Sequence, residues 1–331
     1  SQRVHAMRWI SRAYSNWSAG RQRLMAETIA ELAAARMAGS PAVVSCRRMS
    51  SGFANANYRL ETSAGVVLLR HRSVQDRAEV LYELDVLEWL GNQGFPAPAV
   101  LRFDAGDRWI AGPDDTYLVL LEWLEGTEPE LQNSTVTTIA RALGDLHRLP
   151  SPSGDWWRRE NPVGRLVVAP LAESTGADLP EHFAFFAEEF ALLRDRLGAP
   201  LPVGFIHGDL FPDNTLFRGE ELVAILDFEA ACEDALLFDV AMAIHGFCFP
   251  DEQWSPELAE AFVGAYSERR PLEEAEREAL PTYLRWCPLA MMGWHLQELI
   301  RRPDEGNERR AAEFARRITT MREENWAPSW D

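Results

Sequence analysis

The chain has 331 residues, of which 47% are hydrophobic and 25% charged, and its mean hydropathy is −0.24. These values are typical of a soluble globular protein of two lobes or domains, and no apolar run reaches the roughly 18 residues of a membrane helix. The sequence contains no lysine, so all 33 basic residues are arginines. That excludes a P-loop, which needs the lysine of GxxxxGK[ST], and every mechanism that uses a Schiff-base lysine.

The formal net charge of −18 argues against nucleic acid as a partner, because phosphate contacts require a basic surface. It favours a cationic small molecule or a metal ion, although a uniformly solvated acidic surface is an equal interpretation. The four cysteines include no CxxC pair and are expected to be reduced thiols. Residues 1–7 lack the pattern of a signal peptide, so we expect a cytoplasmic protein.

The first part of the chain predicts a β-rich lobe that follows a helical extension. Apolar residues recur at helical spacing between Arg21 and Gly39, within a segment, 8–39, that is helical in character. The hydrophobic period then changes to that of strands, with one helix whose apolar stripe is stopped by Gly91. The expected strands are 42–48, 57–62, 66–70, 99–103 and 116–126, and the expected helix is 76–91.

From about Gly126 the chain is mostly helical. We expect helices near 136–146 and 180–197, a loop over 150–170, a short polar β segment over 203–226, and helices from 238 to 322. The predicted organisation is an α+β chain of two lobes with a cleft. Its parts are a helical extension (1–39), a small antiparallel β-rich N-lobe (40–121), a hinge (122–126) and a larger helical C-lobe (127–331).

The β segment VGFIHGDLFPDNTLFRGEELVAILDFE carries the strongest motif. An apolar strand leads into His207 and Asp209, Asn214 follows five residues later, and the next apolar run ends on Asp227. Phosphoryl transfer from ATP needs an oxygen to orient the attacking hydroxyl and oxygen ligands for Mg²⁺. The spacing H-x-D-x-x-x-x-N is the kinase catalytic-loop pattern, so we expect a kinase-type site.

The N-lobe supplies candidates for the nucleotide. Arg70 ends a strand where a kinase places its phosphate-binding lysine, and Glu83 on the following helix is its expected partner, because a buried carboxylate is costly unless paired. A Glu83 that reaches solvent at the edge of the stripe is the alternative. Other ATP contacts are also expected. Gly52 lies in the first loop, for which an ordinary hairpin turn is an equal interpretation, and the hinge backbone at Glu122 and Leu124 is expected to contact the adenine edge. Leu68 and Leu216 would lie on either side of the adenine ring, although plain core packing explains these two leucines as well.

With these motifs, HGDLFPDN and ILDFE, the chain resembles the aminoglycoside phosphotransferase and choline kinase superfamily over roughly residues 42–300. The resemblance implies a protein-kinase-like fold and phosphorylation of small-molecule hydroxyls with ATP and Mg²⁺. It implies that Asp209 is the catalytic base, assisted by Asn214, and that Asn214 and Asp227 bind Mg²⁺. His207 and Asp239 would support the catalytic loop.

Several further stretches are similar to type II homoserine kinases, namely ANANY (54–58), ACEDALLFDVA (231–241) and YSERRPLEEAEREALPTYLR (266–285). Two positions depart from that subfamily: His245 begins His-Gly-Phe where an Asn-Asp-Trp run is typical, and Glu229 replaces an aromatic. We therefore name Glu229 and His245 as candidate substrate contacts. His147 is expected to brace a helix and not to act in catalysis.

The leading hypothesis is an ATP- and Mg²⁺-dependent kinase, acting as a monomer or homodimer on a small amine-bearing metabolite, with homoserine as the first candidate. An aminoglycoside-type antibiotic or another amino alcohol is the alternative substrate. A nucleotide-binding pseudokinase-like module is the alternative of another class, because a guanidinium at position 70 is bulkier than an ammonium. A metallohydrolase built on His207 is weaker, since no further histidine follows at ligand spacing.

Overall fold

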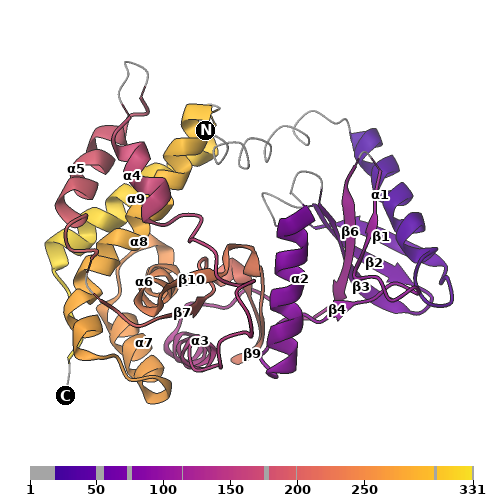
Figure 1. Ribbon diagram of the computed structural model, residues 1–331, viewed down its shortest axis with the longest axis horizontal. Coiled ribbons are helices and arrows are strands. Elements are labelled where there is room, and N and C mark those ends of the chain that lie inside the picture. The colour runs from indigo at the N-terminus through magenta and orange to yellow at the C-terminus, as the bar shows by residue number, and fades with distance from the viewer. Residues whose placement is uncertain are drawn as a thin grey trace. The chain divides into compact units, whose positions relative to one another are not determined.

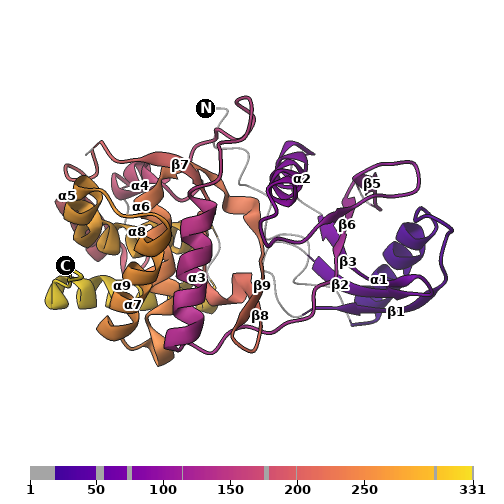
Figure 2. The same ribbon diagram turned by 90° about the horizontal axis from the view of Figure 1, so that it is seen from below.

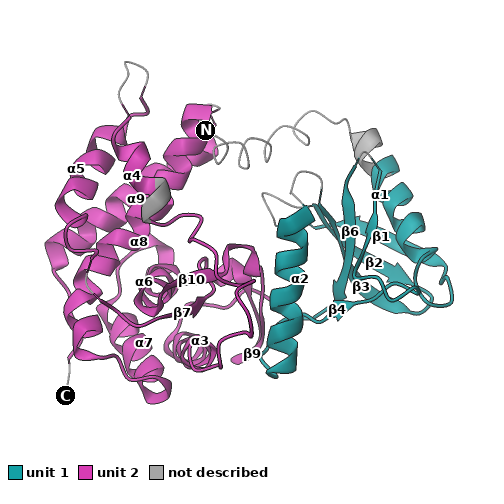
Figure 3. Ribbon diagram, in the orientation of Figure 1, with its two compact units in different colours: residues 1–125 teal, residues 126–331 magenta. Residues whose placement is uncertain are grey.

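The computed structural model describes residues 19–49, 56–72, 77–113, 115–174, 179–198, 200–301 and 304–329. The chain forms two compact units, residues 1–125 and 126–331 (Figure 3). Unit 1 is a sheet with helices, and unit 2 is mainly helical, so the expected mixed α+β architecture with an antiparallel N-terminal sheet is confirmed.

The sheet of unit 1 is antiparallel, in the order β1-β2-β3-β6-β4, and β5 also pairs with β6. Its central strand pair, β3 and β6, carries Arg70 opposite Val119. The predicted strands are all present, but β5 was not predicted, because three residues are too short a run to show a period. The strands are β1 (Val43–Arg48), β2 (Ala56–Thr62), β3 (Gly65–Arg72), β4 (Val100–Leu101), β5 (Trp109–Ala111) and β6 (Tyr117–Glu122).

Two helices lie on opposite sides of this sheet (Figures 1 and 2). Helix α1 (Ala19–Ala34) buries Ile29 against the sheet residues Leu60 and Leu69, and it ends five residues before the predicted Gly39. Helix α2 (Arg77–Asn92) buries the predicted apolar stripe. The part of the helical prediction that covers residues 8–18 lies outside the described residues.

Helix α8 (Glu274–Arg301) is the longest helix of unit 2 and packs against α4, α5, α6 and α9 (Figure 1). The prediction of a loop over 150–170 is wrong at its end, where helix α4 begins at Arg165. An internal Pro170 and the polar residues that precede the helix hide its apolar pattern in the sequence, although Val168 is fully buried. The other helices are α3 (Asn133–Leu146), α4 (Arg165–Ala172), α5 (Phe183–Leu193), α6 (Leu236–Phe247), α7 (Pro256–Arg269) and α9 (Glu305–Glu324).

Two short antiparallel ladders interrupt these helices. Strand β7 (Val203–Ile206) pairs with β10 (Cys232–Ala235), and β8 (Thr215–Arg218) pairs with β9 (Glu221–Ile225). Strand β10 was not predicted, since two of its four residues are acidic, and its pairing with β7 decides its conformation. The loops 207–214 and 226–231 join these strands and carry the predicted catalytic residues.

The four cysteines form no disulfide, in agreement with the expected thiols. Within the described ranges, no helix is both long enough and apolar enough to cross a membrane.

Candidate active site

The loop after β7 turns sharply at Gly208. Its φ is +82°, a conformation that side chains disfavour, and a Cβ atom at this position would lie 2.6 Å from the carbonyl oxygen of Ala230. Glycine is therefore required where loop 207–214 passes loop 226–231.

Asp239 holds this turn in place from helix α6. Its carboxylate is fully buried and accepts the backbone N–H groups of His207, at 2.6 Å, and of Gly208, at 2.7 Å. His147, directly after α3, approaches the same carboxylate at 3.3 Å and forms a hydrogen bond with Tyr266 through its other ring nitrogen. Buried acids survive when hydrogen bonds replace their hydration, so Asp239 is placed to brace the loop.

His207 lies within the same network and not at a reacting position. Its Nε2 donates to the carbonyl oxygen of Leu226 at 2.8 Å, and its Nδ1 accepts the backbone N–H of Asp209 at 3.2 Å. Burial lowers the pKa of His207, against the opposing effects of Asp239 and of the Leu226 hydrogen bond. The Nε2 hydrogen bond ties loop 207–214 to loop 226–231, and the supporting role of His207 stays a prediction.

Asp209 is oriented by Asn214. The Asn214 amide donates to the Asp209 carbonyl oxygen at 2.8 Å and to its carboxylate Oδ2 at 3.3 Å. Burial raises the pKa of Asp209 well above its usual value, and the carboxylates of Asp227 and Asp213 add to that effect. Asp209 therefore lies near two other carboxylates, and the neutral amide of Asn214 fixes the position of its Oδ2.

Asp227, the second residue of loop 226–231, has a strained backbone conformation. Its φ and ψ are 58° and 66°, in the left-handed region, which costs a non-glycine residue about 1–3 kcal/mol. The N–H of Leu226, the residue before it, donates to the carbonyl oxygen of Asn214 at 2.8 Å, so Asn214 and Asp227 are linked through the backbone. Backbone strain of this kind is typical of functional sites, where the surrounding structure holds it in place.

The side-chain oxygens of Asp209, Asn214 and Asp227 fit a magnesium ion. Two carboxylates and one amide offer hard oxygen ligands, and Asn214 spends its N–H donors on Asp209, which leaves its amide oxygen as a possible ligand. Burial is the main cause of the raised pKa of Asp209, and the added repulsion from Asp227 and Asp213 is what a divalent cation would relieve.

In unit 1, the predicted partners Arg70 and Glu83 form a buried ion pair, and Asn57 Oδ1 accepts from Arg70 Nε at 3.0 Å. Burial by itself would raise the pKa of Glu83, but two guanidiniums outweigh it and hold that pKa below its usual value. The second guanidinium belongs to Arg72, which sequence reasoning missed. Its signal was present, because residues 70 and 72 of one strand point to the same face.

The remaining predicted ATP contacts stay predictions. Leu68 on β3, Leu124 after β6 and Leu216 on β8 are half-buried, and Glu122 is exposed at the end of β6. Gly52 lies outside the described residues. The candidate substrate contact Glu229 is half-buried in the single turn Phe228–Ala230, next to the strained Asp227.

The placement of His245 does not support its predicted contact with substrate. Its ring is 1% exposed inside α6, donates through Nε2 to the carbonyl oxygen of Leu284 at 2.6 Å, and stacks on Phe249. The sequence prediction rested only on the His-Gly-Phe run, which differs from the subfamily pattern. The packing of α6 on α8 gives this histidine a structural role.

The placement of His245 predicts an acid sensitivity. Burial, reinforced by the Arg317 guanidinium, lowers its pKa to about 3. Below the unfolded-state pKa of about 6.5, the unfolded chain binds a proton that the folded chain refuses, so stability falls with falling pH. Between pH 7 and pH 5 this amounts to about 2 kcal/mol from His245 alone.

We therefore expect H245Q, whose amide can keep the bond to Leu284, to flatten that dependence by about 2 kcal/mol. Urea unfolding of both proteins at pH 7 and pH 5, followed by circular dichroism, measures it. The comparison removes the contributions of other histidines, and parallel pH dependences in the two proteins would contradict this assignment.

Comparison with known proteins identifies the family of this chain. Residues 45–280 match the family model described as "Phosphotransferase enzyme family", and the chain belongs to that family. It is a kinase that transfers a phosphoryl group to a hydroxyl group.

The chain is similar to curated homoserine kinases. It is 33% identical to that of Rhodopseudomonas palustris (strain BisB18) over 270 residues, 79% of this chain and 81% of the relative. The homoserine kinase of Methylobacterium nodulans (strain LMG 21967 / CNCM I-2342 / ORS 2060) is 30% identical over 314 residues, 86% and 93% of the two chains. These relatives confirm the resemblance inferred from the motifs.

Two solved structures confirm the kinase-like fold. An amicoumacin kinase in complex with AMP-PNP, Ca²⁺ and Ami superimposes with a TM-score of 0.70 at 15% identity, covering 92% of this chain and 96% of that one. A microcompartment-associated aminopropanol kinase superimposes with a TM-score of 0.68 at 23% identity, covering 90% and 97%.

Proposed function

We propose that this protein is an ATP- and Mg²⁺-dependent kinase of a small amine-bearing alcohol, with homoserine as the leading substrate. The observation that carries the proposal is the Asp209 carboxylate, oriented by Asn214 on a loop that Asp239 braces. The homoserine kinases among its relatives support the choice of substrate.

In the proposed mechanism, the oxygen of the substrate hydroxyl forms a bond to the γ-phosphorus of ATP, and Asp209 accepts the proton of that hydroxyl. The bond between the γ-phosphorus and the bridging oxygen breaks, and ADP is released. Asn214 keeps the accepting oxygen in position. The raised pKa of Asp209 makes its carboxylate a better proton acceptor. Asn214 and Asp227 would hold Mg²⁺, which neutralises phosphate charge when bound.

In the proposed nucleotide site, Arg70 takes the part that lysine plays in protein kinases and contacts the α- and β-phosphates, while the segment 122–126 serves as the hinge. Glu83 and Asn57 hold the Arg70 guanidinium from two sides, so its orientation is set before ATP binds. Arg70 donates to Asn57 from Nε and to Glu83 from Nη1, two separate atoms of a planar group, whereas a lysine would offer one nitrogen without that fixed fork.

R70K is therefore expected to raise KM for ATP about tenfold, with a smaller change in kcat. Steady-state kinetics with ATP varied at saturating substrate separates the two constants. R47K, on the exposed β1, is the matched control and should leave both unchanged. An unaltered KM in R70K would remove Arg70 from phosphate binding.

The substrate assignment is tested by incubating the protein with Mg²⁺, ATP and single candidate alcohols, and by detecting the phosphorylated product by mass spectrometry. Homoserine, aminopropanol, ethanolamine and an aminoglycoside panel cover the candidates. We expect product from homoserine. Product from another candidate and none from homoserine would move the protein to that substrate, and hydrolysis of ATP with no phosphorylated acceptor would reject all of them.

An amino alcohol without a carboxylate is the second candidate, because the superimposed aminopropanol kinase has 23% identity over 90% of this chain. In the substrate panel, aminopropanol and ethanolamine test this candidate, because both carry an amine and a hydroxyl group but no carboxylate.

A further inference from the structure

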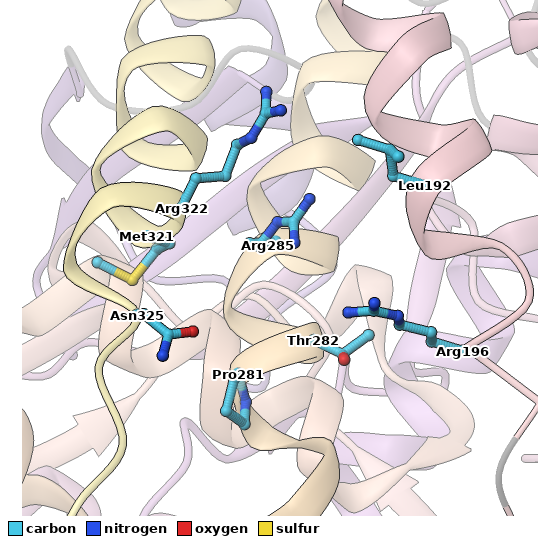
Figure 4. A pocket seen from close by; sticks show the side chains of 8 residues that line it. All are labelled: Leu192, Arg196, Pro281, Thr282, Arg285, Met321, Arg322 and Asn325. Carbon is cyan, nitrogen blue, oxygen red and sulfur yellow. The ribbon is translucent and has the colours of Figure 1, made fainter.

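Unit 2 contains a cavity of about 300 Å³ that no step of the proposed reaction uses. It is lined by residues of α8, of α9 and its C-terminal end, and of α5 and the turn that follows it (Figure 4). None of the lining residues belongs to the loops 207–214 and 226–231 that carry Asp209, Asn214 and Asp227.

The cavity is cationic in a chain of net charge −18. Three of its lining residues are arginines, and none is acidic. Two of them, Arg285 and Arg322, share the buried carboxylate of Glu189, at 2.6 and 3.5 Å. Arg196 forms no ion pair within the described part of the chain, whereas its neighbour Arg194 pairs with Asp195. The three lining guanidiniums and the Glu189 carboxylate that two of them share therefore carry a net charge of two positive units.

Neutral donors complete the lining. Thr282 on α8 offers a hydroxyl, and Asn325 after α9 offers an amide, while Arg196 extends its guanidinium toward Thr282 (Figure 4). Glu189 has no exposed surface and fixes the guanidinium of Arg285, which is 18% exposed, so part of this donor set is oriented before a ligand arrives. A fixed guanidinium fork matches the oxygens of phosphate.

We propose that this cavity binds a small phosphate-bearing anion. The excess of two positive charges matches a dianion, which inorganic phosphate and phosphate monoesters approach near pH 7. The volume is at the lower limit of small-molecule sites, and it leaves room beyond one phosphate group for a short organic group against Leu192 and Met321. Free phosphate and a phosphorylated amino alcohol are the two sources of this chemistry.

Isothermal titration calorimetry tests the proposal on the full chain. Inorganic phosphate and O-phosphoethanolamine are titrated separately at constant ionic strength, with Mg²⁺ and AMP-PNP at saturation so that the nucleotide site is filled. We expect saturable one-site binding of at least one probe. Tighter binding of the monoester assigns the site to phosphorylated metabolites, and equal binding assigns it to the phosphate group alone.

The variant R196Q removes the cavity arginine that forms no ion pair with any described residue, and it leaves the Glu189 group intact. We therefore expect the dissociation constant of the bound probe to rise at least about tenfold. R194Q, two residues away and outside the cavity lining, is the matched control and should bind as the unmodified protein does. No saturable binding of either probe, or equal affinity in R196Q and the unmodified protein, would overturn the proposal. Because the titration involves no turnover, its outcome is independent of the identity of the kinase substrate.

Discussion

The variant D209N is expected to lower kcat by about 10²- to 10⁴-fold, the usual contribution of a positioned general base. An asparagine keeps the volume of the side chain and can still accept from Asn214, but its amide does not accept the proton of the substrate hydroxyl. The structure should survive, because removing a crowded charge also removes the repulsion from Asp227 and Asp213. Product formation under saturating ATP and substrate, together with the unfolding midpoint, measures both effects.

D213N is the matched control for this result. Asp213 lies in the same loop, is exposed, and adds only a lesser part of the repulsion that raises the pKa of Asp209. We expect its kcat to stay within a few-fold of the unmodified protein. Equal turnover in D209N and the unmodified protein would reject Asp209 as the base.

The second large effect concerns stability. E83Q is expected to lower the free energy of unfolding by about 3–5 kcal/mol, because breaking a buried ion pair leaves its partner charges without compensation. The Glu83 side chain is 5% exposed and contacts both Arg70 and Arg72, which are 8% and 1% exposed. A neutral amide in its place would face two guanidiniums with no carboxylate between them. Urea unfolding followed by circular dichroism measures the change.

E88Q, on the same helix, separates this effect from a general loss of helix charge. Glu88 pairs with Arg102 and Arg108, but all three side chains are between 21% and 52% exposed. Exposed pairs contribute about 0–1 kcal/mol, so E88Q should change stability by no more than that. Similar losses in E83Q and E88Q would contradict the central role of the buried Arg70, Glu83 and Arg72 group.

The accuracy of the sequence predictions followed the length of the pattern behind each one. Helix α2 and strands β2 and β3 have sustained apolar periods and were predicted close to their observed bounds, whereas β6 ends at Glu122, four residues before its predicted end. Strand β10 and helix α4 were missed, because two acids in four residues and an internal proline mask their local signals. Both form through partners distant in sequence, β7 for the strand and α8 for the helix.

The sequence alone determined the family and the chemistry. The catalytic motif is a local property of the sequence, because it depends on the spacing of His207, Asp209, Asn214 and Asp227. The sequence also shows an arginine at position 70, in a chain without lysine. It also predicted the Arg70 and Glu83 pair, since one carboxylate on an apolar stripe needs a partner.

Only the tertiary structure decided the surroundings of these residues. Arg72 pairs with the carboxylate of Glu83, and His245 is buried where α6 packs on α8. Arg196, Arg285 and Arg322, which are distant in sequence, line one cavity. The reason is physical: a motif records spacing along one segment, whereas burial and charge balance depend on segments that meet only after folding.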